Sequence, residues 1–164
     1  MSEIIIVDNN DKIIWYKSIN SLKKDDIYRV SALWITNSKN EILLAKRHHT
    51  KSHHPNKWWP AVSWTIEKWE NYINNIIKET EEEIWLKNIK PIIWPKTNTN
   101  NEYNHFTQWF LLRIDKNIDE FILEKNEVEK VKRISVKELE KQFKKQQENF
   151  VPGMGKYFEL FRNV

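Results

Sequence analysis

The 164-residue chain contains no cysteine and only two glycines. Because no sulfur can be deprotonated or oxidised as a thiol, disulfides, thiolate metal sites and thiol nucleophiles are excluded. No apolar run approaches the roughly eighteen residues that a membrane helix needs, and the N-terminus lacks the basic region and apolar stretch of a signal peptide. We therefore expect no membrane association and a cytoplasmic location.

What is present fits one globular domain. Hydrophobic residues make up 40% of the chain, aromatic residues 13%, and charged residues of both signs 30%. The length requires no second core, and no repeat or linker interrupts it, so we predict a single domain over residues 1–164. The net charge of +4 is mild, and the lysines are scattered among glutamates. This pattern favours small anionic substrates over specific nucleic-acid binding.

Apolar runs separated by turn-forming clusters predict a sheet of several strands. The predicted strands cover residues 4–7, 13–16, 28–36, 41–47, 89–94, 105–114 and 128–134, with an apolar segment at 58–64 and a loop at 95–104. Residues 135–146 read as a helix with a capping box, and 155–161 as a last amphipathic segment. Between them, residues 70–86 show helical spacing, with a stripe formed by Tyr72, Ile73, Ile76, Ile77, Thr80 and Ile84.

Three carboxylates lie at positions 0, 3 and 4 of this predicted helix: Glu79, Glu82 and Glu83. This spacing places them on one face, where like charges repel by a few tenths of a kcal/mol per pair. A hard divalent cation would remove that repulsion. When the spacing is taken alone, a solvated acidic face balanced by Lys78 and Lys87 is the preferred interpretation. The spacing alone leaves both interpretations open.

The residues around these carboxylates form a longer motif. It consists of Trp64, Glu70, Lys78-Glu79, Thr80, Glu82-Glu83, Trp85 and Leu86. The motif resembles the signature of the Nudix hydrolase family, Gly-x5-Glu-x7-Arg-Glu-apolar-x-Glu-Glu-x-Gly-apolar. All four glutamates stand at the required spacing, and the predicted strand, loop and helix order around them is also similar.

The resemblance implies an α/β (α+β) fold, a Nudix-like α/β/α sandwich with a central mixed sheet. It implies that Glu79, Glu82 and Glu83 bind Mg²⁺, with Mn²⁺ as a second candidate. Glu70 would order the loop or the metal-bound water. The implied reaction is attack of water on a phosphorus of a pyrophosphate linkage. The substrate class would be a nucleoside diphosphate-type or related small molecule. Lys78 keeps the charge of the family's Arg without its bidentate fork, which would weaken catalysis.

Members of the family differ in the general base, and the candidates outside the motif are Glu127, Glu129 and Glu102. Glu127 is preferred because a Glu upstream of the last strand often has this role in relatives; a surface Glu among lysines is the alternative. The catalytic set implied by the resemblance is therefore Glu70, Lys78, Glu79 and Glu127.

A second cluster lies in the loop at 48–57, which holds four histidines and several cations. Imidazoles at such spacing can chelate a transition metal, but a phosphate-facing basic loop or plain solvent exposure is the favoured interpretation. Arg47 ends the preceding strand and is the best candidate for a substrate phosphate contact. Lys57 and Tyr103 complete the predicted substrate-binding set, and Tyr103 could equally pack in the core.

Two other functions stay open. The layout of residues 43–47 and 54–58 before the motif is similar to the branch close to isopentenyl-diphosphate isomerases. Those enzymes use a Cys just before the motif, and residues 59–63 contain none. A non-catalytic binding module with the same fold is the other alternative, although such modules usually lose the carboxylates. Hydrolysis is therefore preferred, with the oligomeric state, including a homodimer, left open.

The nine tryptophans are as unusual as the glycine shortage. Two stand at glycine positions of the motif, and four others follow turn-like or polar contexts where relatives place glycine. We hypothesise that UGA codons meaning glycine were read as tryptophan at these positions; UGG codons there would refute it. The six positions are Trp15, Trp59, Trp64, Trp69, Trp85 and Trp94.

Overall fold

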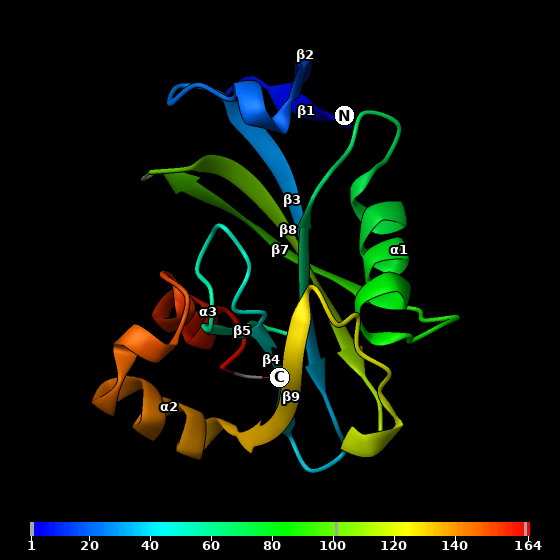
Figure 1. Ribbon diagram of the computed structural model, residues 1–164, viewed down its shortest axis with the longest axis vertical. Helices are drawn as coiled ribbons and strands as arrows, with labels where there is room; N and C mark the ends of the chain where they lie inside the picture. Colours follow the sequence, from blue (N-terminus) through cyan, green and yellow to red (C-terminus); the bar gives the residue numbers. More distant parts are fainter. Residues whose placement is uncertain (1, 101, 163) are drawn as a thin grey trace.

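The computed structural model describes residues 2–100, 102–162 and 164, and its centre is a mixed sheet (Figure 1). The strands are β1 (Glu3–Val7), β2 (Ile13–Ser18), β3 (Ile27–Thr36), β4 (Glu41–Arg47), β5 (Trp58–Pro60), β6 (Val62–Thr65), β7 (Ile92–Asn100), β8 (Asn104–Arg113) and β9 (Val128–Ser135). β3 pairs antiparallel with β1, β4 and β6, and parallel with β8 from Ile27↔Asn104 to Thr36↔Arg113. The predicted mixed sheet is confirmed.

The central strands are buried on both faces, which explains why β3, β4 and β8 read as nearly continuous apolar runs. Successive side chains point to opposite faces of a strand. In β3, Ala32 and Trp34 enter one core while Leu33 and Ile35 enter the other. β4 and β8 divide their residues in the same way. The sheet therefore needs a helical layer on each side.

The helices supply these two layers (Figure 1). α1 (Tyr72–Ile84) covers one face, while α2 (Val136–Lys145) and α3 (Met154–Leu160) cover the other. Short 3-10 turns lie at η1 (Ile19–Ser21), η2 (Ile118–Glu120) and η3 (Gln147–Asn149). The α/β/α sandwich is thus confirmed. Within the described residues, no helix is both long and apolar enough to cross a membrane.

Several predicted boundaries change, and two of the changes have a clear local cause. The helix predicted over residues 70–86 begins at Tyr72, because the side chain of Asn71 accepts a hydrogen bond from the backbone N–H of Asn74 at 2.9 Å. β7 extends to Asn100, so most of the predicted loop at 95–104 is strand. Its polar residues pair with β8, and the register shift between Ile93 and Lys96 accommodates Pro95. Pairing with a neighbour, rather than local apolarity, makes this segment a strand.

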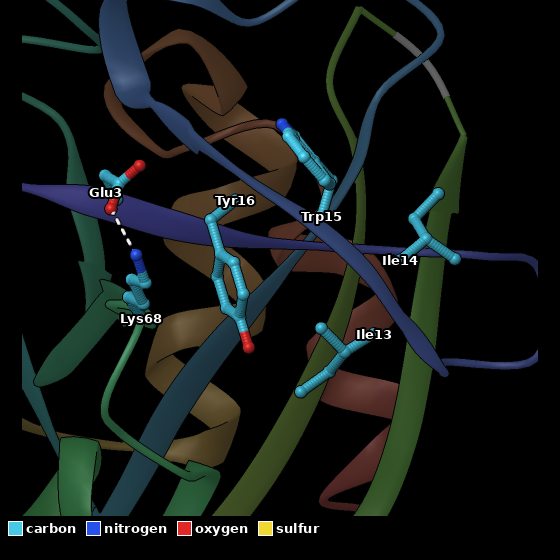
Figure 2. A pocket seen from close by; sticks show the side chains of 6 residues that line it. All are labelled: Glu3, Ile13, Ile14, Trp15, Tyr16 and Lys68. Atoms are coloured by element: carbon cyan, nitrogen blue, oxygen red, sulfur yellow. Dashed lines mark hydrogen bonds and ion pairs between the residues drawn. The ribbon is translucent and has the colours of Figure 1, made fainter.

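The β1–β2 hairpin carries a shallow pocket on its outer side (Figure 2). The amine of Lys68 forms an ion pair with Glu3 at 2.7 Å and lies 5.0 Å from the ring centre of Tyr16. Trp15 and Tyr16 leave β2 in opposite directions, as the pleat of a strand requires. Trp15 is 66% exposed. The carboxylates of the motif are not among the residues that line this pocket.

The imidazole of His105 in β8 makes stability depend on pH. Burial lowers the pKa of His105 to about 4. The folded chain therefore keeps it neutral while the unfolded chain takes up a proton below about 6.5. This contribution is complete above pH 6.5 and is lost as the pH falls towards 4, on the order of 2–3 kcal/mol. We expect the unfolding free energy, measured with urea, to decrease less between pH 7 and pH 4.5 in His105→Gln than in the wild-type chain. An equal decrease in both proteins would contradict this.

Candidate active site

The three motif carboxylates of α1 differ in their burial. Glu79 and Glu83 face the sheet and are only 4% and 2% exposed, whereas Glu82 is exposed. Glu79 and Glu83 share a face of the helix because they are four residues apart, whereas Glu82 is rotated away from that face by one position. The solvated acidic face, which the spacing left open, is therefore wrong for two of the three residues.

Glu83 is the most unusual of these groups. Neither of its carboxylate oxygens has a hydrogen-bond partner among the described residues. Burial, and then the nearby carboxylates of Glu79 and Glu127, raise the pKa of Glu83 well above its ordinary value. An uncompensated buried carboxylate is costly, and the cost is removed by a proton or by a cation. The donor atoms are hard oxygens, so the pocket fits Mg²⁺ or Mn²⁺.

Lys78 bridges two glutamates of the motif. Its amine lies 2.6 Å from Glu70 and 3.0 Å from Glu79. Glu70 also accepts hydrogen bonds from the side chain of Asn75 at 2.7 Å and from the backbone of Glu67 at 3.1 Å. Burial acts to raise the pKa of Glu70, but these bonds, led by that from Lys78, lower it overall. Glu70 and Lys78 therefore tie the strand-to-helix loop to the first turns of α1.

Glu79 has a different electrostatic environment. Burial raises the pKa of Glu79 to about 7, with further contributions from Glu82 and Glu70, although Lys78 acts in the opposite direction. Near neutral pH this carboxyl group therefore exchanges between its acidic and basic forms. Perturbed carboxyl groups of this kind are typical of functional clefts.

The three motif carboxylates of α1 line one cleft. Its lining includes Glu79, Glu82 and Glu83 from α1 and Glu124 and Glu127 from the segment before β9. Backbone hydrogen bonds fix that segment: Glu124 N–H donates to the carbonyl of Glu83 at 2.9 Å, and Glu127 N–H donates to the carbonyl of Glu124 at 3.0 Å. Glu127 thus lies beside the motif helix, whereas Glu129 is paired with Lys46 at 3.1 Å.

The predicted substrate residues lie in three different environments, and none lines this cleft. Arg47 is 8% exposed, and its guanidinium lies 4.0 Å from the ring centre of Trp59 and donates to the carbonyl of His53 at 2.9 Å. Burial lowers the pKa of Arg47, and the nearby charges of Glu83 and Glu127 oppose this.

Tyr103 and Lys57 are tied to other parts of the chain. The hydroxyl of Tyr103 lies 3.0 Å from Nδ1 of His53. The amine of Lys57 donates to the carbonyl of Glu148. Arg47 and Tyr103 therefore both contact His53 of the same loop. Lys57 instead holds the C-terminal segment, so its predicted substrate role has no geometric support.

Neither cluster forms a closed coordination shell. In the part of the chain that the structure describes, no three His, Asp or Glu side chains gather closely enough to hold a metal ion. This applies to the loop histidines and to the motif glutamates alike. A cation at Glu83 would therefore require Glu79 and Glu82 to turn towards it.

Two tryptophans also line the cleft, Trp64 and Trp85. Trp85 ends α1 with its backbone in the left-handed region, at a φ of 52°. Its backbone N–H donates to the carbonyls of Glu81 and Thr80. Six described residues other than glycine have positive φ, and the five besides Trp85 are Asp11, Asn40, His54, Asn56 and Asn88. Asn, Asp and His tolerate this conformation, whereas a bulky aromatic residue is strained in it.

The structure adds one residue that the sequence did not indicate. Lys51 of the His-rich loop places its amine 2.6 and 2.7 Å from the two carboxylate oxygens of Glu127. The two residues are 76 positions apart, so no local spacing could have predicted the contact.

Comparisons with known proteins agree with this geometry. The family model described as NUDIX domain matches residues 27–154. Protein DR0079 of Deinococcus radiodurans superposes with a TM-score of 0.85 at 16% identity, covering 98% of this chain and 99% of that one. A MutT protein from Methanosarcina mazei gives 0.71 at 19% identity, covering 87% and 96%.

An Ap4A hydrolase from C. elegans gives a TM-score of 0.61 at 17% identity, covering 82% of this chain and 95% of that one. Curated protein sequences contain no match. The structural likenesses, all at low identity, show the fold, while the family model covers most of the chain, including the glutamate motif. The chain therefore belongs to the Nudix family of pyrophosphohydrolases.

Proposed function

We propose that this chain is a metal-dependent hydrolase of a pyrophosphate linkage in a nucleoside diphosphate-type or related small molecule, with Mg²⁺, or alternatively Mn²⁺, as its ion. The observation that carries the proposal is the buried carboxylate of Glu83, which has no hydrogen-bond partner in the described chain and lines a cleft shared with Glu79, Glu82 and Glu127. A bound cation would offset both the charge of this buried carboxylate and its repulsion from the neighbouring glutamates.

The residues have separate roles in this proposal. Glu79, Glu82 and Glu83 would hold the ion, which when bound neutralises phosphate oxygens and acidifies water. Glu70 and Lys78 keep the loop and Glu79 in place through their ion pair. Glu127 lies across the cleft from α1 and takes the proton of the attacking water as general base.

Substrate binding is assigned to the loop side. The charge of the Arg47 guanidinium interacts with those of Glu83 and Glu127, and the group suits a phosphate oxygen because its donors form a planar fork. Tyr103 stacks or donates at the outer end of this side through its contact with His53. One structural neighbour, from C. elegans, is an Ap4A hydrolase, which supports a nucleotide-type substrate for this chain.

The two alternatives differ from hydrolysis in measurable ways. An isopentenyl-diphosphate isomerase would rearrange its substrate without releasing phosphate, and the segment before the motif lacks the Cys that this chemistry uses there. A binding module would bind a diphosphate without turnover. The four retained glutamates favour an enzyme.

A panel of pyrophosphate compounds, assayed for phosphate release with Mg²⁺, tests the proposal. The wild-type chain is expected to cleave at least one compound, and the double variant Glu82→Gln, Glu83→Gln none. Glu140→Gln with Glu159→Gln removes two carboxylates from α2 and α3 on the other face and should keep the activity. Unchanged turnover in the first double variant would refute the assignment of Glu82 and Glu83 to the metal site. No turnover in a folded chain with glycine restored at the six tryptophan positions would refute hydrolysis. Isomerisation of an isopentenyl substrate would instead support the isomerase.

We also propose a small-molecule diphosphate as the partner, without specific nucleic-acid binding, and a cytoplasmic location. A homodimer stays a prediction that sedimentation of the purified chain tests.

A further inference from the structure

Lys51 occupies the rim of the acidic cleft. Its amine contacts both carboxylate oxygens of Glu127, at 2.6 and 2.7 Å, and lies 5.1 Å from the ring centre of Trp64. Both of these partners line the cleft. The side chains of Lys51 and Glu127 are 20% and 26% exposed, so the pair is partly screened from water.

Two cations act on the buried carboxylate of Glu83 in this structure, Arg47 and Lys51. Arg47 is immobilised, since its guanidinium stacks on Trp59 and donates to the carbonyl of His53. Lys51 instead stands on the turn that follows β4, and its flexible stem ends at the ion pair with Glu127. Lys51 is also the more exposed of the two cations, since its side chain is 20% exposed while Arg47 is 8% exposed.

The ion pair also has a consequence for Glu127. Both of its carboxylate oxygens accept hydrogen bonds from Lys51, so the group proposed as general base is occupied. A divalent cation beside Glu83 would repel the lysine amine, while a diphosphate would attract it. The same movement would free Glu127 and bring a cation to the substrate.

We propose that Lys51 is a mobile counter-ion of the cleft, which pairs with Glu127 in the metal-free chain and moves to the diphosphate of the substrate when metal and substrate bind. The inference rests on the proposed function and assigns to Lys51 a substrate contact that the motif does not contain.

Calorimetric titration of Mn²⁺, followed by methylenediphosphonate as a non-hydrolysable diphosphate, tests this in the whole chain. Lys51→Met should bind Mn²⁺ alone roughly two- to fivefold more tightly, because a competing partly exposed ion pair is removed. It should bind methylenediphosphonate, in the presence of Mn²⁺, about tenfold more weakly, because a charge-assisted hydrogen bond is lost. Lys51→Arg should retain most of that affinity.

Lys46→Met is the matched control. Lys46 forms a comparable ion pair with Glu129 at 3.1 Å, with side chains 21% and 33% exposed, but neither residue lines the cleft. Lys46→Met should leave the affinities for Mn²⁺ and for methylenediphosphonate unchanged within the error of the titration. Equal effects of the two methionine variants would show that only general surface charge acts, and would overturn the proposal.

The outcomes also separate this inference from the proposed function. Wild-type chain that binds Mn²⁺ and hydrolyses a diphosphate, with Lys51→Met unchanged in both affinities, contradicts the role of Lys51 alone. Wild-type chain that binds no Mn²⁺ and releases no phosphate contradicts both. Weaker Mn²⁺ binding by Lys51→Met would show that the lysine supports the metal site rather than competing with it, and also overturns the proposal.

Discussion

Replacing Glu83 by Gln is expected to abolish Mg²⁺-dependent hydrolysis and, at the same time, to stabilise the metal-free chain. The loss of activity should be about a thousandfold, because a group that holds the metal contributes several kcal/mol to the transition state. The gain in stability should be on the order of 1–3 kcal/mol, the cost of a buried carboxylate that lacks a partner.

The pH dependence of that gain has a defined sign. The pKa of Glu83 is raised in the folded chain, chiefly by burial, so the fold favours the protonated acid. The cost of the ionised group is therefore absent below the ordinary pKa of a Glu and grows as the pH rises above it. Wild type and Glu83→Gln should unfold at similar urea concentrations near pH 4 and differ at pH 8.

Urea unfolding in EDTA and phosphate release with Mg²⁺ measure the two effects separately. Glu81→Gln serves as the control for stability, since Glu81 is 48% exposed on the same helix and pairs with Lys87. It should give no stabilisation. A Glu83→Gln variant that is less stable than wild type without metal would mean that the carboxylate is compensated in solution.

The second large effect is expected at Trp85. Trp85→Gly should stabilise the chain by about 1 kcal/mol, because the left-handed conformation at the end of α1 is strained for a bulky residue and open to glycine. The indole offers little packing in return, since it is 53% exposed. Thermal unfolding of the variant measures the change.

The control for this substitution is Trp109→Gly. Trp109 is 2% exposed, makes an edge-to-face contact with Phe161 at 5.3 Å between ring centres, and donates from its indole to Thr97 at 3.0 Å. Removing it should cost several kcal/mol, in the range of large-to-small substitutions in a core. Opposite signs for the two variants would show that only some tryptophans belong to the architecture. Destabilisation by Trp85→Gly would contradict the strain argument.

The six suspect tryptophans are not equivalent in the structure. Trp15 and Trp69 are 66% and 88% exposed, and Trp69 lies in the turn closed by the bond from Glu70 N–H to the carbonyl of Glu67. Trp59 has a buried indole N–H without a partner among the described residues. Trp94, in contrast, packs on the core and donates to the carbonyl of Leu160 at 3.0 Å.

The hypothesis of UGA codons read as tryptophan predicts a UGA codon, meaning glycine, at all six positions. Sequencing of the gene tests it directly, and UGG at these codons would refute it. Glycine at Trp64 and Trp85 would also remove two indoles from the lining of the acidic cleft. We therefore expect the glycine-restored chain to hydrolyse its substrate faster than the tryptophan form.

The sequence by itself determined the sheet, the motif helix and the spacing of its glutamates. These are local properties: apolar residues that enter alternate faces of β3, β4 and β8, and side chains that recur every three or four residues on α1, follow from the period of each element. The family resemblance also followed from a contiguous motif, and the match over residues 27–154 confirms it.

Only the tertiary structure decided how deeply each carboxylate is buried and which cations face it. Periodicity indicates a face of a helix but not what covers it, so Glu83 and the exposed Glu82 looked alike in the sequence. Lys51 reaches Glu127 across 76 positions because the turn after β4 folds onto the segment before β9, and Lys57 turns to Glu148 across 91. The first contact depends on how β4 and β9 pair, and the second on the bridge between Trp58 and Phe150, so no local spacing records either of them.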